Sequence, residues 1–394
     1  MNEVEVHNRD LLGVTTPSGA LGVPAAAATG VQPYQFLKAF IDGDVIHSKD
    51  NPITPEQLQP ASVDLRLGSV AYRVRASFLP DRRSTVIEKA KAVMDAHEID
   101  LTHGAVLDRG QVYVIPLQES LHLPASVRGL ANPKSSTGRL DVLVRLIAEN
   151  GVDFDRVDEG YAGPLYLEVA PQTFSVVVRP GTSLNQIRFI RGSKGAALTN
   201  GLLKRLYESN ELVRPPTEKL AAHDSLVPVT IDLNGDGHNP IGYRAKEYTP
   251  RIDLGQKYHY DWQDYWEPIY PRKSTLTLIP EAFYILATRE EVRVPENLAA
   301  EMVAYESRSG EYRVHYAGFF DPGFGCDPSG KGSKAVLEVR SYVPFMLEHS
   351  QPVGWLRYEK MAAPPIKLYG SGLGSSYQSQ GLALAKQFKP IVLS

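Results

Sequence analysis

The chain has 394 residues, of which 43% are hydrophobic and 22% charged, and its formal net charge is −3. This composition is typical of a soluble protein with two or three cores, and it excludes a global positive field that would attract nucleic acid or an anionic membrane. A single cysteine, Cys326, excludes an internal disulfide framework and a cysteine-based zinc site. The acidic start and the lack of an apolar run of about 20 residues predict a cytoplasmic protein.

Taken in chain order, the sequence predicts an all-β protein with a few short helices. Residues 1–32 contain an Ala-, Gly- and Pro-rich stretch and are expected to form a mobile arm. Apolar residues at helical spacing predict short helices near 34–41, 85–97 and 198–212. Between them, alternating runs punctuated by Gly and Pro predict strands. The predicted units are an arm at 1–32, a first domain at 33–197, a helical linker at 198–220 and a second domain at 221–394.

The two predicted domains repeat one pattern. Matching segments recur in the same order, at offsets between 163 and 171 residues. A period this long indicates two whole domains in tandem rather than a solenoid. The matched pairs are Pro60–Leu65 with Pro228–Leu233, Tyr113–Ile115 with Tyr284–Leu286, Leu123–Pro124 with Val294–Pro295, Asp158–Tyr161 with Asp321–Phe324, and Leu167–Val169 with Leu337–Val339.

The first copy contains a candidate phosphate-binding loop at Pro133–Leu140. Within it, six residues supply two cations, three hydroxyls and a glycine: Lys134, Ser135, Ser136, Thr137, Gly138 and Arg139. Hydroxyls and backbone N–H groups bond phosphate oxygens, glycine permits close approach, and cations offset the charge. A polar turn is the alternative interpretation of the same composition.

Two further motifs follow the loop. Asp158 and Tyr161 lie in a hairpin motif that could bond a sugar hydroxyl and pack a ring against the sugar, although the motif alone favours an ordinary hairpin turn with a core Tyr. Glu168 and Glu338 each occupy the centre of a Leu-Glu-Val run. An inward-facing glutamate would be desolvated and suited to proton transfer, whereas an outward-facing one would only be solvated.

Together these motifs resemble those of dCTP deaminases, members of the trimeric dUTPase-like superfamily, and the two-domain length is similar to a long bacterial form. The resemblance implies two tandem distorted jelly-roll or β-barrel domains of the dUTPase-like, β-clip type. It also implies zinc-independent hydrolysis of dCTP to dUTP and ammonia, with Mg²⁺ on the triphosphate. Glu168 falls on the family's catalytic glutamate, with Ser135 orienting the water and Arg139 supporting the charge. Substrate contacts are expected from Lys134, Ser136, Thr137, Gly138, Arg156, Asp158, Tyr161, Gln186, Tyr369, Tyr377 and Gln380.

The second copy departs from this pattern. Its loop, Glu306–Glu311, has Glu311 where the first copy has Arg139, and the family's flap lysine is replaced by Ser376. Two arrangements follow: a first-copy site closed by the second copy's flap, or a composite site that combines the first copy's loop with Glu338. We favour Glu168, because it shares a repeat with the intact loop.

The resemblance implies a homotrimer with sites between subunits, and dTTP as a possible inhibitor. Neither a nucleic acid nor a membrane is an expected partner. Two alternatives stay open. The chain could be a dUTP pyrophosphatase or a bifunctional dCTP deaminase/dUTPase, or it could be a non-catalytic nucleotide-sensing protein.

Overall fold

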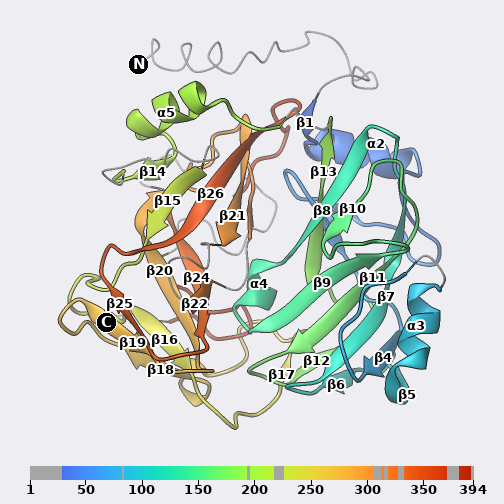
Figure 1. Ribbon diagram of the computed structural model, residues 1–394, viewed down its shortest axis with the longest axis horizontal. Coiled ribbons are helices and arrows are strands. Elements are labelled where there is room, and N and C mark those ends of the chain that lie inside the picture. The colour runs from blue at the N-terminus through green and yellow to red at the C-terminus, as the bar shows by residue number, and fades with distance from the viewer. Residues whose placement is uncertain are drawn as a thin grey trace.

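The computed structural model describes residues 29–81, 84–192, 196–216, 226–304, 312–314, 318–326, 332–370 and 381–391. Within these residues the chain is mostly strands with a few short helices, which confirms the all-β prediction. The two repeats lie side by side, and α4 (Ser135–Gly138) lies where they meet (Figure 1). No helix among these residues has the length and apolar character needed to cross a membrane.

Repeat 1 consists of strands β1 to β13 together with three helices and one 3₁₀ turn. The helical elements are α2 (Tyr34–Asp42), α3 (Val86–Ala92), α4 and η1 (Pro55–Gln57). The strands are β1 (Gly30–Val31), β2 (Ile46–Ser48), β3 (Val63–Leu65), β4 (Val70–Val74), β5 (Met94–Asp100), β6 (Ala105–Leu107), β7 (Val112–His122), β8 (Val127–Pro133), β9 (Val142–Ala148), β10 (Arg156–Val157), β11 (Ala162–Pro171), β12 (Val176–Val178) and β13 (Asn185–Arg191).

Repeat 2 begins after helix α5 (Asn200–Glu208), whose N-cap Thr199 accepts a hydrogen bond from the N–H of Leu202. Its 3₁₀ turn is η2 (Trp262–Asp264). The strands are β14 (Val213–Arg214), β15 (Leu226–Thr230), β16 (Gly242–Ala245), β17 (Ile252–Asp253), β18 (Trp266–Ile269), β19 (Thr275–Leu278), β20 (Phe283–Val292), β21 (Leu298–Ala304), β22 (Tyr312–Val314), β23 (Phe319–Phe320), β24 (Ser333–Ser341), β25 (Phe345–Glu348) and β26 (Pro352–Lys360).

Strand pairing in the two repeats is equivalent. In repeat 1 the order β5-β4-β7-β11-β9 matches β18-β16-β20-β24-β22 in repeat 2. The second sheet of repeat 1 joins β3 and β8 to β13, just as β15 and β21 join β26 in repeat 2. The duplicated sequence pattern therefore corresponds to a duplicated topology.

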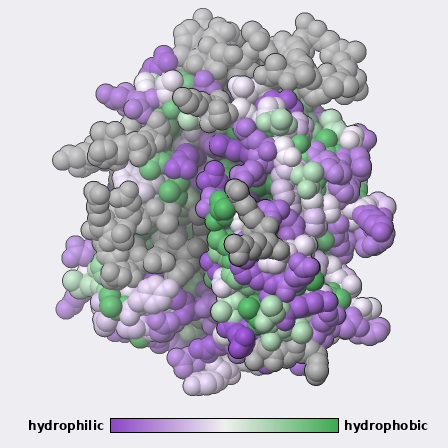
Figure 2. All heavy atoms as spheres, turned by 45° about the vertical axis from the view of Figure 1, so that its right-hand side comes forward, coloured by the Kyte–Doolittle hydropathy of each residue, from purple (hydrophilic) through white to green (hydrophobic). Residues whose placement is uncertain are grey.

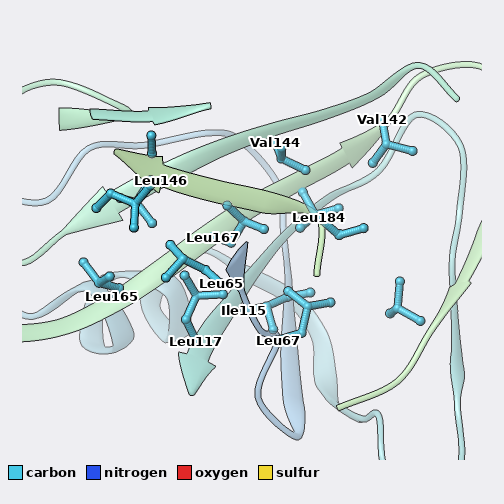
Figure 3. Close-up of a cluster of buried hydrophobic side chains, with 14 of the residues drawn as sticks. Leu65, Leu67, Ile115, Leu117, Val142, Val144, Leu146, Leu165, Leu167 and Leu184 are labelled. Carbon is cyan, nitrogen blue, oxygen red and sulfur yellow. The ribbon is translucent and has the colours of Figure 1, made fainter. Parts of the chain in front are cut away.

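The buried apolar residues form two main clusters: one centred on repeat 1 that also includes side chains of β16, β18 and β20, and one in repeat 2. In repeat 1, alternate residues of β7, β9 and β11 point into one apolar cluster, where Ile115, Leu146 and Leu167 are fully buried and lie close together (Figure 3). The core of repeat 2 contains the equivalent Leu286 and Leu337, also fully buried. Hydrophilic residues cover most of the described surface on one face of the molecule, and apolar ones are scattered in small groups (Figure 2). The burial of apolar area, which contributes about 25 cal/mol of stability per Å², is the main force that holds each barrel together.

Several contacts join the repeats. Strand β17 of repeat 2 pairs in parallel with β12 of repeat 1. The guanidinium of Arg340 on β24 donates to the carboxylate of Asp141 and, at 2.9 Å, to the hydroxyl of Thr173, both in repeat 1. In the opposite direction, the fully buried Arg188 on β13 donates to the carbonyl of Ala300 at 3.2 Å. These polar contacts fix how the two barrels face each other.

Two local predictions are corrected. The mobile arm was predicted to extend to Gln32. Gly30 and Val31 instead form β1, which pairs with the end of β13, and Val31 is fully buried. Residues 1–28 lie outside the described part. The helix predicted for 85–97 ends at Ala92, because the chain from Met94 continues as β5 and pairs with β4.

Candidate active site at the junction of the repeats

A cleft of about 390 Å³ lies between the two repeats. Repeat 1 contributes the predicted phosphate loop, and repeat 2 contributes the end of β23 with the following hairpin, and the middle of β24. The residues that line the cleft include Asp64, Lys134, Ser135, Ser136, Gly138, Arg139, Gln186, Lys257, Phe319, Phe320, Asp321, Phe324, Lys334, Glu338, Tyr369 and Lys386. The cleft thus collects polar and charged groups from segments far apart in the sequence.

The loop is held against the start of β13. The N–H of Lys134 donates to the carbonyl of Leu184 at 3.0 Å, and the hydroxyl of Thr137 donates to the same carbonyl at 2.8 Å. The hydroxyl of Thr137 is engaged in this bond, and Thr137 does not line the cleft. This differs from the expectation that Thr137 contacts the substrate. Ser135, Ser136 and Gly138 do line it, as predicted from the sequence.

The two cations of the loop have different surroundings. Lys134 forms an ion pair with Asp64, which lies in the duplicated Pro60–Leu65 motif. Arg139 is buried and donates to the carbonyls of Ala383 and Leu384, at 3.0 and 3.4 Å. The chain after the predicted flap is therefore bonded directly to the phosphate loop.

Glu338 of repeat 2 faces this loop. It lies at the centre of β24, opposite Ile285 of β20, and is 5% exposed. Burial raises the pKa of Glu338 from 4.5 to about 8, and the positive charge of Arg139 partly opposes that rise. A carboxyl group with a pKa near neutrality can both release and accept a proton, as general acid–base catalysis requires.

The structure corrects the expectation that Glu168 would face the loop of its own repeat. Glu168 does not line the cleft. Its Oε1 accepts hydrogen bonds from Nε and Nη2 of Arg145, at 2.9 and 2.5 Å. The reason is topological. The loop follows β8 in one sheet of the barrel, whereas Glu168 is on β11 of the other sheet, beside Arg145 of β9.

The hairpin of repeat 1 is also directed away from its own loop. Arg156, Asp158 and Tyr161 line a separate cavity of about 280 Å³. There the hydroxyl of Tyr161 donates to the carbonyl of Pro164 at 2.5 Å, and Arg156 pairs with the exposed Asp153. These three predicted substrate contacts are therefore not brought to the cleft that contains the loop.

Their counterparts in repeat 2 take that place. Asp321 is buried 3.6 Å from the guanidinium of Arg188, and desolvation raises the pKa of Asp321 to about 6 despite that cation. Phe324 packs edge-on against Phe320, with ring centroids 5.1 Å apart, and against Tyr369 at 5.6 Å. These rings form an apolar wall suited to a planar base or a sugar.

Of the other predicted contacts, Gln186 and Tyr369 line the cleft. The amide oxygen of Gln186 accepts a hydrogen bond from Ser62 at 3.1 Å. Tyr377 and Gln380 lie outside the described residues, as does the second copy's loop at 306–311. The sequence interpretation missed the roles of Asp321 and Phe324, although the duplicated pattern had already paired them with Asp158 and Tyr161.

Within the described residues, one group of three His, Cys, Asp or Glu side chains has ligand atoms close enough together to hold a metal ion: Asp44, His47 and His122. None of the three lines the cleft. Within the cleft, Asp64 is paired with Lys134 and Asp321 with Arg188.

Comparison with known proteins identifies the family. Residues 28–193 match the N-terminal domain, and residues 199–388 the C-terminal domain, of 2'-deoxycytidine 5'-triphosphate deaminase. The crystal structure of the dCTP deaminase from Agrobacterium tumefaciens is 48% identical, with a TM-score of 0.80, and the match covers 86% of this chain and 100% of that one. This chain belongs to the dCTP deaminase family.

Curated family members match over part of the chain. The dCTP deaminase, dUMP-forming, of Dictyoglomus thermophilum is 30% identical over 155 residues, which are 39% of this chain and 74% of the relative. The dCTP deaminase of Halorubrum lacusprofundi is 26% identical over 155 residues, which are 39% of this chain and 73% of the relative. These relatives therefore match less than half of this chain, although the match covers most of their own length.

Proposed function

We propose that this chain hydrolyses dCTP to dUTP and ammonia at the junction of its two repeats. One observation carries the assignment to this cleft: the intact phosphate loop of repeat 1 and the buried Glu338 of repeat 2 line the same cavity. The composite arrangement thereby replaces our first preference for Glu168. The substrate's triphosphate lies on Ser135, Ser136 and Gly138, and its base lies toward the aromatic wall of repeat 2.

Glu338 acts as the proton shuttle. It takes a proton from water as the oxygen bonds to C4 of cytosine, and delivers it to the ring nitrogen N3. It then moves the proton of the new C4 hydroxyl to the amino group, so that the C4–N bond breaks, ammonia leaves and the C4 carbonyl forms. The pKa of about 8 suits both directions of transfer.

Two residues of the loop assist this shuttle. The hydroxyl of Ser135, exposed at the start of α4 in the cleft, orients the attacking water. Arg139 stabilises Glu338 when it is ionised, because its positive charge already favours the carboxylate form. Mg²⁺ would bind chiefly to the triphosphate, because this ion is held by phosphates, waters and a few carboxylates.

A pair of matched variants tests the assignment. Glu338→Gln should lower kcat for ammonia release by about 10²- to 10⁴-fold, the usual contribution of a general acid–base, and leave dCTP binding within a few-fold. Glu168→Gln alters an equally buried glutamate at the equivalent position and should change kcat little. A larger loss from Glu168→Gln would refute the composite site.

A second activity is favoured by the name of the Dictyoglomus thermophilum relative, "dCTP deaminase, dUMP-forming". A bifunctional enzyme would release pyrophosphate as well as ammonia. Measuring both products from dCTP, and pyrophosphate from dUTP added alone, separates deaminase, bifunctional enzyme and dUTP pyrophosphatase. Bound but unaltered dCTP would instead indicate a nucleotide-sensing protein.

The homotrimer, dTTP inhibition and a cytoplasmic location stay predictions. Both halves of the proposed site come from one chain, so activity of this cleft does not require a neighbouring subunit. Mass photometry, with and without dTTP, measures the oligomeric state, and initial rates with added dTTP measure inhibition.

A further inference from the structure

Two lysines outside the predicted motifs reach the cleft. Lys386 is half-buried in the segment after the predicted flap, and Lys257 is exposed in the loop after β17. Their two segments are bonded together, because the N–H of Tyr258 donates to the carbonyl of Lys386 at 2.9 Å. The N–H of His259 donates to the carbonyl of Gln387, also at 2.9 Å. Lys257 and Lys386, which are 129 positions apart in the chain, are thus held at one end of the cleft.

The segment that carries Lys386 is firmly anchored. Leu384, Ala385 and Phe388 are buried in the apolar cluster that is centred on repeat 1 and also includes strands of repeat 2. The ring of Phe388 packs edge-on against Tyr265, with centroids 5.3 Å apart. On the other side, Arg139 of the phosphate loop donates to the backbone carbonyl of Leu384. The position of Lys386 is therefore coupled to the loop that receives the phosphates.

The charges of the cleft are unequally compensated. Lys134 is paired with Asp64, and Lys334 with Asp232. For Lys257 and Lys386, by contrast, the part of the chain that the structure describes provides no ion pair. The predicted flap at 369–380 contains no acidic residue that could provide one. Among the described residues, two cations at the phosphate end of the site are therefore available to an anion.

The surroundings of Lys386 show how strongly an anion would be favoured. Burial, together with the positive charges of Lys134 and Lys257, lowers the pKa of Lys386 to about 8, although Asp64 opposes this change. A cluster of like charges in a partly buried site is unfavourable until an anion compensates it. Such a cluster is suited to a polyphosphate rather than to a neutral nucleoside.

We propose that Lys386 and Lys257 bind the terminal phosphates of the nucleotide, and so make this site selective for triphosphates over mono- and diphosphates. The inference rests on the proposed function for the identity of the nucleotide. The proposed binding of polyphosphate by these two lysines rests only on the geometry of the two anchored segments and on their uncompensated charge. Lys386, the more buried of the two, contributes the larger share.

The decisive experiment measures tripolyphosphate binding by isothermal titration calorimetry. Lys386→Met should weaken the Kd by about ten- to hundredfold, the usual value of a hydrogen bond to a charged group. Lys257→Met should weaken it less, since that side chain is exposed. Lys386→Arg keeps the charge and should retain most of the affinity. Lys389→Met is the matched control, because Lys389 is in the same segment but exposed and paired with Asp261, at 2.8 Å.

Steady-state kinetics provide the selectivity arm. Lys386→Met should lower kcat/KM for dCTP mainly through KM, and it should leave kcat/KM for dCMP within about twofold. An unchanged Kd for tripolyphosphate, or equal losses for dCTP and dCMP, would overturn the proposal. If wild-type protein binds tripolyphosphate through Lys386 but releases no ammonia from dCTP, the proposed function is wrong, whereas the proposed binding of polyphosphate by Lys386 is confirmed.

Discussion

Replacing Glu338 by glutamine should make the stability of this protein less sensitive to pH. In the unfolded chain Glu338 ionises near its ordinary pKa of 4.5, whereas burial in the folded protein raises that pKa to about 8. Between these values the unfolded state loses the proton and the folded state keeps it. The free energy of unfolding of the wild type therefore falls as the pH rises through this window, and stays lower above it. Glutamine cannot ionise, so the variant escapes this loss.

The magnitude follows from the two pKa values. At about 1.36 kcal/mol per pH unit, the full window corresponds to about 5 kcal/mol, of which about 3 kcal/mol develops by pH 7. An unfolding entropy of about 2.1 cal/mol/K per residue, taken over the whole chain, converts 5 kcal/mol to about 6 °C in Tm. The buried Asp155 and Asp321, whose pKa values desolvation raises to about 7 and about 6, act in the same direction in both proteins. The difference between variant and wild type therefore isolates Glu338.

The measurement is a pair of thermal unfolding series at constant ionic strength from pH 5 to pH 9. The Tm of Glu338→Gln minus that of the wild type should increase with pH up to about pH 8 and then level off. Glu168→Gln serves as the comparison, since it removes an equally buried carboxylate that is bonded to Arg145. A Tm difference that is constant across the series would refute the reasoning that Glu338 is buried in its protonated form.

Two further perturbations probe how the repeats and the hairpin are held. Arg340→Met leaves the buried Asp141 without its partner across the junction and should cost about 3–5 kcal/mol of stability by urea unfolding, whereas adding Asp141→Asn should recover much of the loss. Gly323→Ala should lower kcat/KM for dCTP about tenfold or more, because its φ is +94° and a Cβ would lie 3.1 Å from the N of Tyr369. Gly237→Ala, at a similar φ of +84° with nothing within 4 Å, controls for backbone strain, and equal activity losses would contradict the steric argument.

The sequence predicts the duplicated all-β fold well, because the physical signals for it are local. Alternating apolar residues and turn residues recur with the same spacing in both halves, and equivalent strands then pair in equivalent order. The helix at Tyr34–Asp42 was predictable for the same reason. The strand at Gly30–Val31 was not, because two residues pairing with the edge of β13 leave no periodic pattern.

The composition of the site was only half predictable. The phosphate loop is a local motif, so its residues could be named from their chemistry. The partner of that loop depends on how two barrels pack together, and a repeat pattern states which residues are equivalent without stating which ones face each other. For this reason Glu168 was preferred although Glu338 lines the cleft. Lys386 carries no motif, and its position depends on apolar anchors such as Phe388.

A single site shared between the two repeats would explain why their loops and their equivalent glutamates differ. If the site takes its loop from repeat 1 and its carboxyl group from repeat 2, then the loop of repeat 2 is free to change, and it contains Glu311 where repeat 1 has Arg139. Glu168, the residue of repeat 1 that is equivalent to Glu338, would then be equally free to take another role, and it accepts two hydrogen bonds from Arg145. The side chain of Glu168 is thus held within its own repeat. In the proposed composite site, the packing that brings Arg139 and Glu338 to one cleft would account for both differences between the repeats.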